Sequence, residues 1–372
     1  MENNRRFEMR KFVAPEIIIG VDARLLIDRY LGHFNARHPM LVTDKGIKQL
    51  PWFQELYKQI ESKTDGIVLF DEFTPNPKDF EVMMGAEIFL SSDCDLLIAI
   101  GGGSPIDGAK GISIVSTNGG YILDYEGVDE IRLPGPPLIC IPSTSGTSAD
   151  VSQFAIIQDT TEYVKRAIIS KKVVPDLALL DPIPLMSMSP YLTACTGMDA
   201  LTHAIEAFVS NASSALTDVH AREAIRLIHQ NLRKAVLEEK TLDTMYNMML
   251  ASLQAGLAFS NASLGAVHAM AHSMGGLLNL PHGECNSVLL EHVIALNYDA
   301  APEAYRQICY ACTDVDSTHF DDSQLLSHLL DEIRQLRSDL GIPSTLIVSA
   351  LDEEILDKLT QSALNDPCMI TN

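Results

Sequence analysis

The sequence predicts an α/β half with a parallel sheet, followed by an all-helical half. Over the first 185 residues, short apolar runs alternate with helix-like segments, as in a parallel sheet covered by helices. The rest of the chain has helical periodicity throughout, and 372 residues suffice for two domains. We therefore expect an α/β domain over residues 1–185 and an all-helical domain over residues 186–372. The sequence Asp181-Pro182-Ile183-Pro184 marks the break, because proline disfavours helix.

The strands of the α/β half should be apolar runs bounded by Gly, Pro, Asn or Asp. They are predicted at residues 16–20, 38–44, 66–73, 95–103 including the turn, both ends of 136–157, and, as short or edge strands, 163–169 and 174–181. Helices are predicted between them at residues 23–31, 45–60 and 78–91.

A glycine turn, GGGSPIDGAKG at residues 101–111, follows the strand that starts at residue 95. Glycines allow the backbone to approach a ligand, and the helix that begins near Ser104 offers free N–H groups and a positive dipole end to a pyrophosphate. Ile106 stands where the third glycine of the usual dinucleotide fingerprint would be, and no Gly-Lys-Ser/Thr follows. The turn indicates a nucleotide site, and equally suits a tight strand–helix connection.

Asp44 stands at the carboxyl end of a predicted strand, where an acidic residue can bind an adenosine 2′-hydroxyl and repel a 2′-phosphate. It precedes the glycine turn instead of following it, so the domain should be Rossmann-like without the usual strand order. The alternative is that Asp44 caps the helix that begins at Lys45. The later loop STSGTSAD (143–150) is rich in small polar residues that could surround phosphate and ribose groups.

The helical half should contain eight helices. They are predicted at residues 190–210, 216–237, 241–260, 263–277, 283–297, 301–312, 323–340 and 351–364.

Histidines cluster in this half. The stretch from Asn261 to His292 carries four of the chain's 11 histidines, at positions 268, 272, 282 and 292. His268 and His272 are i and i+4, so they share a helical face, and His282 lies in a Pro-His-Gly turn. This pattern indicates a metal or proton-transfer site, although any one of these histidines alone would more often be a buried core residue.

A carboxylate and a further imidazole lie upstream. Asp199 and His203 are again i and i+4, on a strongly apolar helix where a merely solvated carboxylate is unexpected. One carboxylate with two or three imidazoles suits Fe(II) or Zn(II) and is poor for Ca(II) or Mg(II).

Composition narrows the partners. A formal net charge of −22 argues against nucleic acid and anionic membranes. The seven cysteines form no disulfide framework, and Cys309 and Cys312 are interpreted as two buried thiols. The N-terminus lacks an apolar signal core and no 18-residue apolar run occurs, so we expect a cytoplasmic protein.

Three runs together resemble the iron-dependent (group III) alcohol dehydrogenases: GGGSxxDxAK, DPxxxxxMSPxLTAxTGMDALTHAIEA and GxxHxxAHxxGxxxxxPHGxxN. The resemblance extends from about residue 10 to the end of the chain. It implies a homodimer or larger homo-oligomer that uses NAD and a divalent metal, most often Fe(II) with Zn(II) as an alternative. It implies hydride transfer between a small primary alcohol, whose oxygen the ion would bind, and the nicotinamide.

The resemblance also implies the site residues. The metal ligands would be Asp199, His203, His268 and His282, and His272 would be a catalytic proton-relay or orienting residue beside the nicotinamide. The cofactor residues would be Asp44, Asn76, Gly102, Gly103, Ser104, Ser143, Thr144, Ser152, Phe154, Lys165, Met188 and Leu192.

The chain departs from the family pattern at three places. Ser143, Ala149 and Asp150 replace residues of the usual T-T-x-G-T-x-S-E loop, Ser187 replaces a frequent glycine, and relatives continue past the final CMITN. These changes raise two alternatives: a low-turnover regulatory or sensing paralogue that keeps metal and NAD, or a same-fold enzyme acting on a polyol such as glycerol. The intact His272 and the four implied ligands favour catalysis.

Overall fold

The computed structural model describes residues 11–313, 319–346 and 352–372. These residues form two compact units. The sheet unit comprises residues 13–144 and 148–188, and the helical unit comprises residues 145–147 and 189–372 with Lys11 and Phe12. The expected combination of an α/β half with a parallel sheet and an all-helical half is confirmed.

The sheet unit is built on six parallel strands in the order β1-β9-β6-β4-β2-β3. These strands are β1 (Glu16–Ile19), β2 (Pro39–Val42), β3 (Val68–Phe70), β4 (Leu96–Gly101), β6 (Leu138–Pro142) and β9 (Leu177–Leu180). The order differs from the usual Rossmann arrangement, as expected. Of the two options expected for residues 174–181, the short strand is confirmed and the edge strand is not: β9 has four residues, all buried, and lies between β1 and β6.

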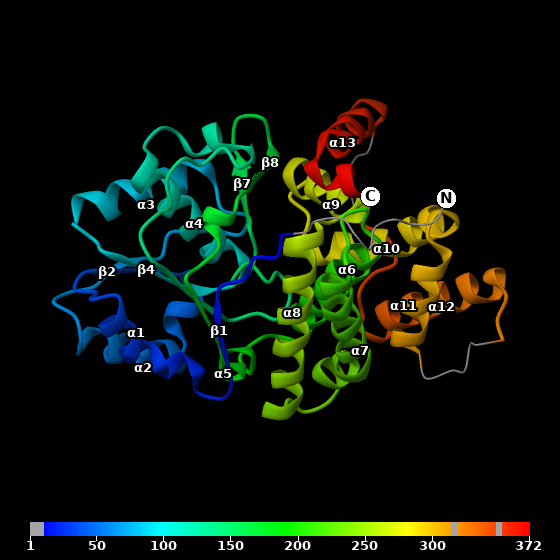
Figure 1. The fold of residues 1–372 in the computed structure, drawn as a ribbon, viewed down its shortest axis with the longest axis horizontal. Coiled ribbons are helices and arrows are strands. Elements are labelled where there is room, and N and C mark those ends of the chain that lie inside the picture. The colour runs from blue at the N-terminus through cyan, green and yellow to red at the C-terminus, as the bar shows by residue number, and fades with distance from the viewer. Residues whose placement is uncertain (1–10, 314–318, 347–351) are drawn as a thin grey trace. The chain divides into compact units, whose positions relative to one another are not determined.

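Helices cover both faces of this sheet (Figure 1). They are α1 (Ile27–His33), α2 (Pro51–Glu61), α3 (Asp79–Ser91) and α4 (Gly103–Asn118), with the short α5 (Pro182–Leu185) and the 3-10 helices η2 (Ala23–Leu26), η3 (Ile47–Gln49), η4 (Ile122–Tyr125) and η5 (Lys171–Val173). Two apolar cores result, one beneath α1 and α2 around Phe53, the other beneath α3 and α4 around Ile112. Because both faces are buried, the strands read as continuous apolar runs in the sequence.

A smaller sheet in the order β5-β8-β7 completes the sheet unit. It contains β5 (Gly127–Val128), β7 (Phe154–Asp159) and β8 (Val164–Ile169), of which β7 and β8 pair as an antiparallel hairpin. The predicted break at residues 181–184 starts α5 instead. Asp181 accepts a hydrogen bond from the N–H of Ile183, and Pro182 occupies the first turn, where the missing N–H costs nothing.

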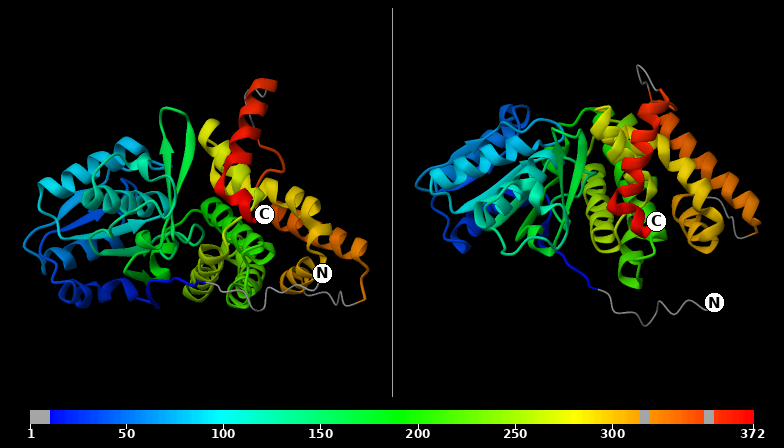
Figure 2. Two further views of the ribbon diagram at one scale, coloured as in Figure 1. Left: turned by 45° about the horizontal axis from the view of Figure 1, so that its top comes forward. Right: turned by 90° about the horizontal axis from the view of Figure 1, so that it is seen from above.

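The helical unit contains α6 (Pro190–Val209), α7 (Ala215–Leu237), α8 (Leu242–Ala262), α9 (Ala266–Leu277), α10 (His282–Asn297), α11 (Pro302–Cys312), α12 (Asp322–Asp339) and α13 (Glu353–Asn365), with η6 (Tyr298–Ala300) and η7 (Pro367–Thr371). Residue 351, where the last helix was expected to begin, lies outside the described residues. The helices α6, α7 and α8 pack side by side, as the two further views also show (Figure 2).

Close packing sets where two of these helices lie. A Cβ on Gly197 would meet Leu232 Cδ1 at 2.2 Å, so this glycine allows α6 and α7 to approach. The helix predicted from residue 263 begins only at Ala266, because Ser263 ends α8 with a φ of 63° and a ψ of −172°, outside the helical region. No helix among the described residues is long and apolar enough to cross a bilayer.

Candidate metal and cofactor sites

The helix α6 presents three ionisable side chains on one face. Asp199, His203 and Glu206 occupy positions i, i+4 and i+7, and each is at most 4% exposed. The helix begins at Ser189, whose hydroxyl accepts a hydrogen bond from the N–H of Leu192, with Pro190 in the first turn. Buried charged groups require partners, so this face must be met by complementary groups.

The neighbouring helices α9 and α10 supply these partners. His268 lies in the first turn of α9 and stacks on His203 with ring centroids 4.5 Å apart. His282 is the first residue of α10, and Pro281 before it directs the chain into that helix. Gly283 contacts α6 so closely that a Cβ there would lie 2.4 Å from the carbonyl oxygen of Cys195. This contact brings the start of α10 against α6.

The side chains converge on the carboxylate of Asp199. The Nε2 atoms of His268 and His282 each lie 3.6 Å from Asp199 Oδ1, and that of His203 lies 3.9 Å from it. Asp199, His268 and His282 each offer a ligand atom, and these atoms lie within 4.8 Å of one another. This spacing suits a set of ligands around one ion.

The side-chain nitrogen of Asn286 lies among these atoms, and its contacts indicate whether a cation would fit at that place. It lies 2.6 Å from Asp199 Oδ1, 3.1 Å from His268 Nε2 and 3.2 Å from His282 Nε2. When His268 and His282 are neutral, three acceptors therefore point their lone pairs at one place, while Asn286 Oδ1 is buried without a hydrogen-bond partner among the described residues. Buried acceptors without enough donors are the arrangement that a divalent cation satisfies, and a carboxylate with imidazoles suits Fe(II) or Zn(II).

The electrostatics of the cluster follow from burial and charge. Burial lowers the pKa of His203 to about 3 despite the nearby Asp199 carboxylate. Burial also opposes protonation of His268, but the Glu206 and Asp199 carboxylates outweigh it and raise its pKa to about 9. Burial opposes ionisation of Asp199, yet the surrounding imidazoles hold its pKa far below its usual range. Asp199 is therefore ionised at neutral pH.

His272 lies next to this cluster with a different partner. Its ring stacks on that of His282, with centroids 5.4 Å apart and planes 9° apart. Its Nδ1 atom lies 2.8 Å from Asp366 Oδ2, in the turn before η7. Asp366 also accepts a hydrogen bond from the N–H of Cys368, a residue that is 1% exposed.

The cofactor residues expected in the glycine turn gather where strands of the large sheet end. The N–H of Ser143 donates to the carbonyl of Gly101, and the N–H of Asn76 donates to Ser104 Oγ at 3.1 Å. A Cβ on Gly102 would touch Thr144 Cγ2 at 3.4 Å. The carboxyl ends of the adjacent strands β6, β4, β2 and β3 thus bring together Asp44, Asn76, Gly102, Gly103, Ser104, Ser143 and Thr144. In open parallel sheets this edge is where ligands bind.

Gly101 shapes the turn itself. Its φ is 153°, and a Cβ there would lie 2.8 Å from Pro105 Cγ, so only glycine is unstrained here. The next residue, Gly102, caps α4, and the first N–H groups of that 16-residue helix face the same edge.

The helix expected to begin at Lys45 is absent: η3 begins at Ile47 with Gly46 as its N-cap, and α2 begins at Pro51, so Asp44 makes only related contacts to the backbone before η3. Its Oδ1 atom accepts hydrogen bonds from the N–H groups of Gly46 and Ile47, at 2.8 and 2.9 Å, at the start of η3. Both bonds use one oxygen, so these contacts do not occupy Oδ2. They are therefore compatible with ribose binding.

The remaining expected cofactor residues are more dispersed. Ser152 and Phe154 are buried next to Lys110, which is also buried. The Nζ atom of Lys110 donates hydrogen bonds to both of their carbonyl oxygens and to Ser152 Oγ. Lys165 lies on β8, in the small sheet. Met188 ends the sheet unit and is 8% exposed, whereas Leu192 belongs to the helical unit and is 43% exposed.

Four residues with prominent contacts had not been assigned a role from the sequence. Glu206 was detectable, since it continues the face of Asp199 and His203 by one further turn of an apolar helix. Lys110 and Asn286 belong to the runs GGGSPIDGAKG and PHGECN, but their spacing alone does not specify their contacts. Asp366 had no local signal at all, because its partner His272 is 94 positions away.

The two halves of the chain match family models. Residues 14–182 match the model "Iron-containing alcohol dehydrogenase", and residues 193–372 match "Fe-containing alcohol dehydrogenase family, C-terminal". The chain is 40% identical over 336 residues to alcohol dehydrogenase 4 of Schizosaccharomyces pombe, covering 90% of this chain and 78% of that protein. It is 37% identical over 372 residues to the 1,3-propanediol dehydrogenase of Citrobacter freundii, covering 98% and 95%.

Solved structures agree with these relatives. A crystal structure of a 1,3-propanediol oxidoreductase superposes with a TM-score of 0.93 at 35% identity, covering 98% of this chain and 96% of that one. The sulfoacetaldehyde reductase of Bifidobacterium kashiwanohense, solved in complex with NAD+, superposes with a TM-score of 0.85 at 26% identity, covering 98% and 94%.

Proposed function

The chain belongs to the iron-containing alcohol dehydrogenase family, and we propose that it is an NAD-dependent, divalent-metal enzyme that interconverts small primary alcohols and aldehydes. The reaction would be alcohol plus NAD+ to aldehyde plus NADH and a proton. The observation that carries this proposal is the convergence of Asp199, His268 and His282 on one point in the helical unit, at which the side-chain nitrogen of Asn286 now lies.

We assign the metal to Asp199, His203, His268 and His282. A divalent ion bound there would polarise the alcohol oxygen and lower its pKa. These residues would hold the ion by one carboxylate oxygen and three imidazole nitrogens and exclude bulk water, since three of them are at most 4% exposed. We propose Fe(II) as the native ion, with Zn(II) as a frequent substitute because it binds such sites more tightly.

We assign NAD to the edge of the large sheet. The first N–H groups of α4 and the Gly102–Ser104 turn would bind the pyrophosphate, and Asp44 Oδ2 would accept a hydrogen bond from the adenosine ribose. Asn76, Ser143 and Thr144 border the same turn. The other expected contacts, Ser152, Phe154, Lys165, Met188 and Leu192, remain part of the proposal. NAD bound in this way would accept the hydride.

His272 would move the proton. Its Nδ1–H donates to Asp366, which leaves Nε2 as the nitrogen that can accept and release a proton. We do not assign it to the ion, because four protein ligands and the substrate oxygen already fill the positions that such a site needs.

We further propose a cytoplasmic homodimer or larger homo-oligomer. None of the seven cysteines, all of which lie in described residues, is part of a disulfide, as expected in a reducing compartment. Light scattering on the purified protein tests the assembly.

The experiment that tests the function combines metal analysis with activity. Protein purified anaerobically should contain one divalent ion per chain and should oxidise small primary alcohols with NAD. The panel should include 1,3-propanediol and glycerol, which test for a diol or polyol substrate. His268→Ala should lose both the ion and the activity, and a variant that loses activity at full metal content would contradict the ligand assignment.

A further inference from the structure

Both carboxylate oxygens of Glu206 make hydrogen bonds to the first turn of α9, where His268 lies. Its Oε2 atom lies 2.5 Å from His268 Nδ1, and its Oε1 atom accepts a hydrogen bond of 2.7 Å from the N–H of Val267. His268 Nε2, the other ring nitrogen, faces Asp199. The carboxylate therefore contacts the side of the imidazole that is opposite the proposed ion.

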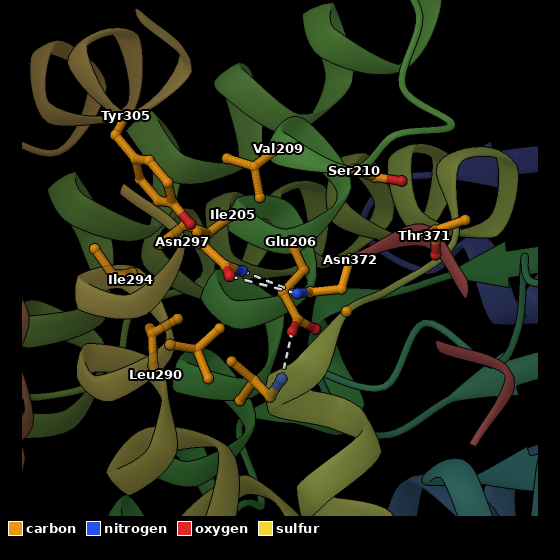
Figure 3. A pocket seen from close by; sticks show the side chains of 13 residues that line it. Ile205, Glu206, Val209, Ser210, Leu290, Ile294, Asn297, Tyr305, Thr371 and Asn372 are labelled. Carbon is orange, nitrogen blue, oxygen red and sulfur yellow. Dashed lines mark hydrogen bonds between the residues drawn. The ribbon is translucent and has the colours of Figure 1, made fainter. Parts of the chain in front are cut away.

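The side chain of Glu206 is almost completely shielded from solvent. It borders a cavity of about 10 Å3 in the helical unit, at the lower limit for a single water molecule (Figure 3). The apolar part of the wall is formed by Ile205, Val209, Val267, Leu290, Val293 and Ile294. Burial there, followed by the charge of Glu206, raises the pKa of the Tyr305 phenol, so Tyr305 stays neutral.

The other polar groups around this cavity bond to one another or to the backbone. Asn297 Nδ2 donates to Asn372 Oδ1, which also accepts a hydrogen bond from the N–H of Ala266, and Thr371 Oγ1 donates to the carbonyl of Leu264. A Cβ on Gly265 would lie 3.0 Å from Glu206 Oε1, so the start of α9 approaches the carboxylate closely. Among the described residues, the hydrogen bonds to the Glu206 carboxylate come from Val267 and His268.

These contacts determine where the proton of a neutral His268 must be. A buried carboxylate only accepts hydrogen bonds, so His268 must carry a proton on Nδ1, and its Nε2 then keeps a lone pair for a metal. The positive end of the α9 dipole favours the negative charge at the same place. Carboxylates that orient metal-binding histidines in this way also raise the basicity of the ligand.

We propose that Glu206 is the positioning residue of His268, fixing the tautomer and ring orientation with which this histidine binds the divalent ion. The proposal rests on the metal ligand set of the proposed function. It adds to that set a buried carboxylate that does not touch the ion.

The variant Glu206→Gln tests whether Glu206 positions the ring of His268 or only caps the start of α9. A glutamine Oε1 can still accept the hydrogen bond from Val267, but its NH2 group would face His268 Nδ1 and require the proton on Nε2 instead. We expect the affinity for Zn(II), measured by competition with a chromogenic chelator, to fall by about 10- to 100-fold. The melting temperature of the metal-free protein should fall less in Glu206→Gln than in Glu206→Ala, because the glutamine keeps the hydrogen bond from Val267.

The control is Glu223→Gln on α7, where the carboxylate pairs with Arg226 at the surface; it should bind Zn(II) like the wild type. Glu206→Ala, which removes both contacts, reports the cost of losing the helix cap. The proposal is overturned if Glu206→Gln binds Zn(II) within threefold of the wild type. It is also overturned if Glu206→Gln destabilises the metal-free protein as much as Glu206→Ala does, because Glu206 would then act only as a cap.

The same titration on His268→Ala separates the two proposals. If His268→Ala binds Zn(II) as the wild type does, the ligand set itself is wrong. If His268→Ala loses the ion while Glu206→Gln keeps it, the ligand set holds and only the role of Glu206 is wrong.

Discussion

Nδ1 of His272 lies 2.8 Å from Oδ2 of Asp366, and both side chains are at most 8% exposed. The contact joins α9 to the turn between α13 and η7, two segments far apart in the sequence. It fixes which nitrogen of His272 is available for proton transfer and holds the ring parallel to that of His282. Two predictions follow from this pair, and a third concerns the cofactor.

His272→Ala should separate proton transfer from metal binding. Because the proposed ligand set does not include His272, the variant should keep one ion per chain, while kcat falls roughly 100-fold and its pH dependence changes. Metal analysis and steady-state kinetics measure the two effects. His292→Ala is the control, since His292 belongs to the same histidine-rich stretch but is exposed on α10. Loss of the ion from His272→Ala would show that His272 is a ligand.

Asp366→Asn should lower the stability of the fold near neutral pH and make that stability less sensitive to acid. Burial opposes ionisation of Asp366, but the charge and hydrogen bond of His272 and the hydrogen bonds from Cys368 outweigh it, so its pKa is lowered to about 2. A carboxyl whose pKa is lower in the folded than in the unfolded state stabilises the fold above about pH 4, and this is lost as pH falls towards 2. The full contribution is about 2.6 kcal/mol, of which about 1 kcal/mol should disappear between pH 5 and pH 3.

Urea unfolding at pH 5 and pH 3 measures this difference. The wild type should lose more stability than Asp366→Asn over that interval, because an asparagine still accepts the hydrogen bond from Cys368 but does not titrate. Glu354→Gln removes a surface pair with Lys358 and serves as the control. Equal losses in the wild type and Asp366→Asn would contradict the stabilising role of the ionised pair.

Asp44 should select NAD over NADP. Its carboxylate would repel the 2′-phosphate, so Asp44→Gly should narrow the NAD/NADP ratio of kcat/KM at least tenfold, or about 1.4 kcal/mol. Asp44→Asn is the sharper variant, because asparagine caps helices as well as aspartate does and removes only the charge. If the wild type uses both cofactors equally, or Asp44→Asn leaves the ratio unchanged, Asp44 acts only through its hydrogen bonds to the backbone of Gly46 and Ile47.

The elements of the fold were largely predictable because they depend on local patterns. Apolar runs bounded by turn residues marked the strands of the sheet, and helical periodicity marked α6 to α13. The errors occurred where one residue decides a boundary. Ser263 leaves the helical region of backbone space and delays the start of α9, and Pro182 starts a short helix where two prolines had indicated a break.

Within the site, helical spacing was enough to predict the pairs that share a turn, such as Asp199 with His203. That spacing places both side chains on one face whatever surrounds the helix. That His268 and His282 meet Asp199 was implied only by the family resemblance and not by spacing, and only the tertiary structure shows that Asp366 meets His272 and that Glu206 lies behind His268. These contacts join helices through close approaches at glycines such as Gly265 and Gly283, and packing between distant segments leaves no periodic signal in the chain.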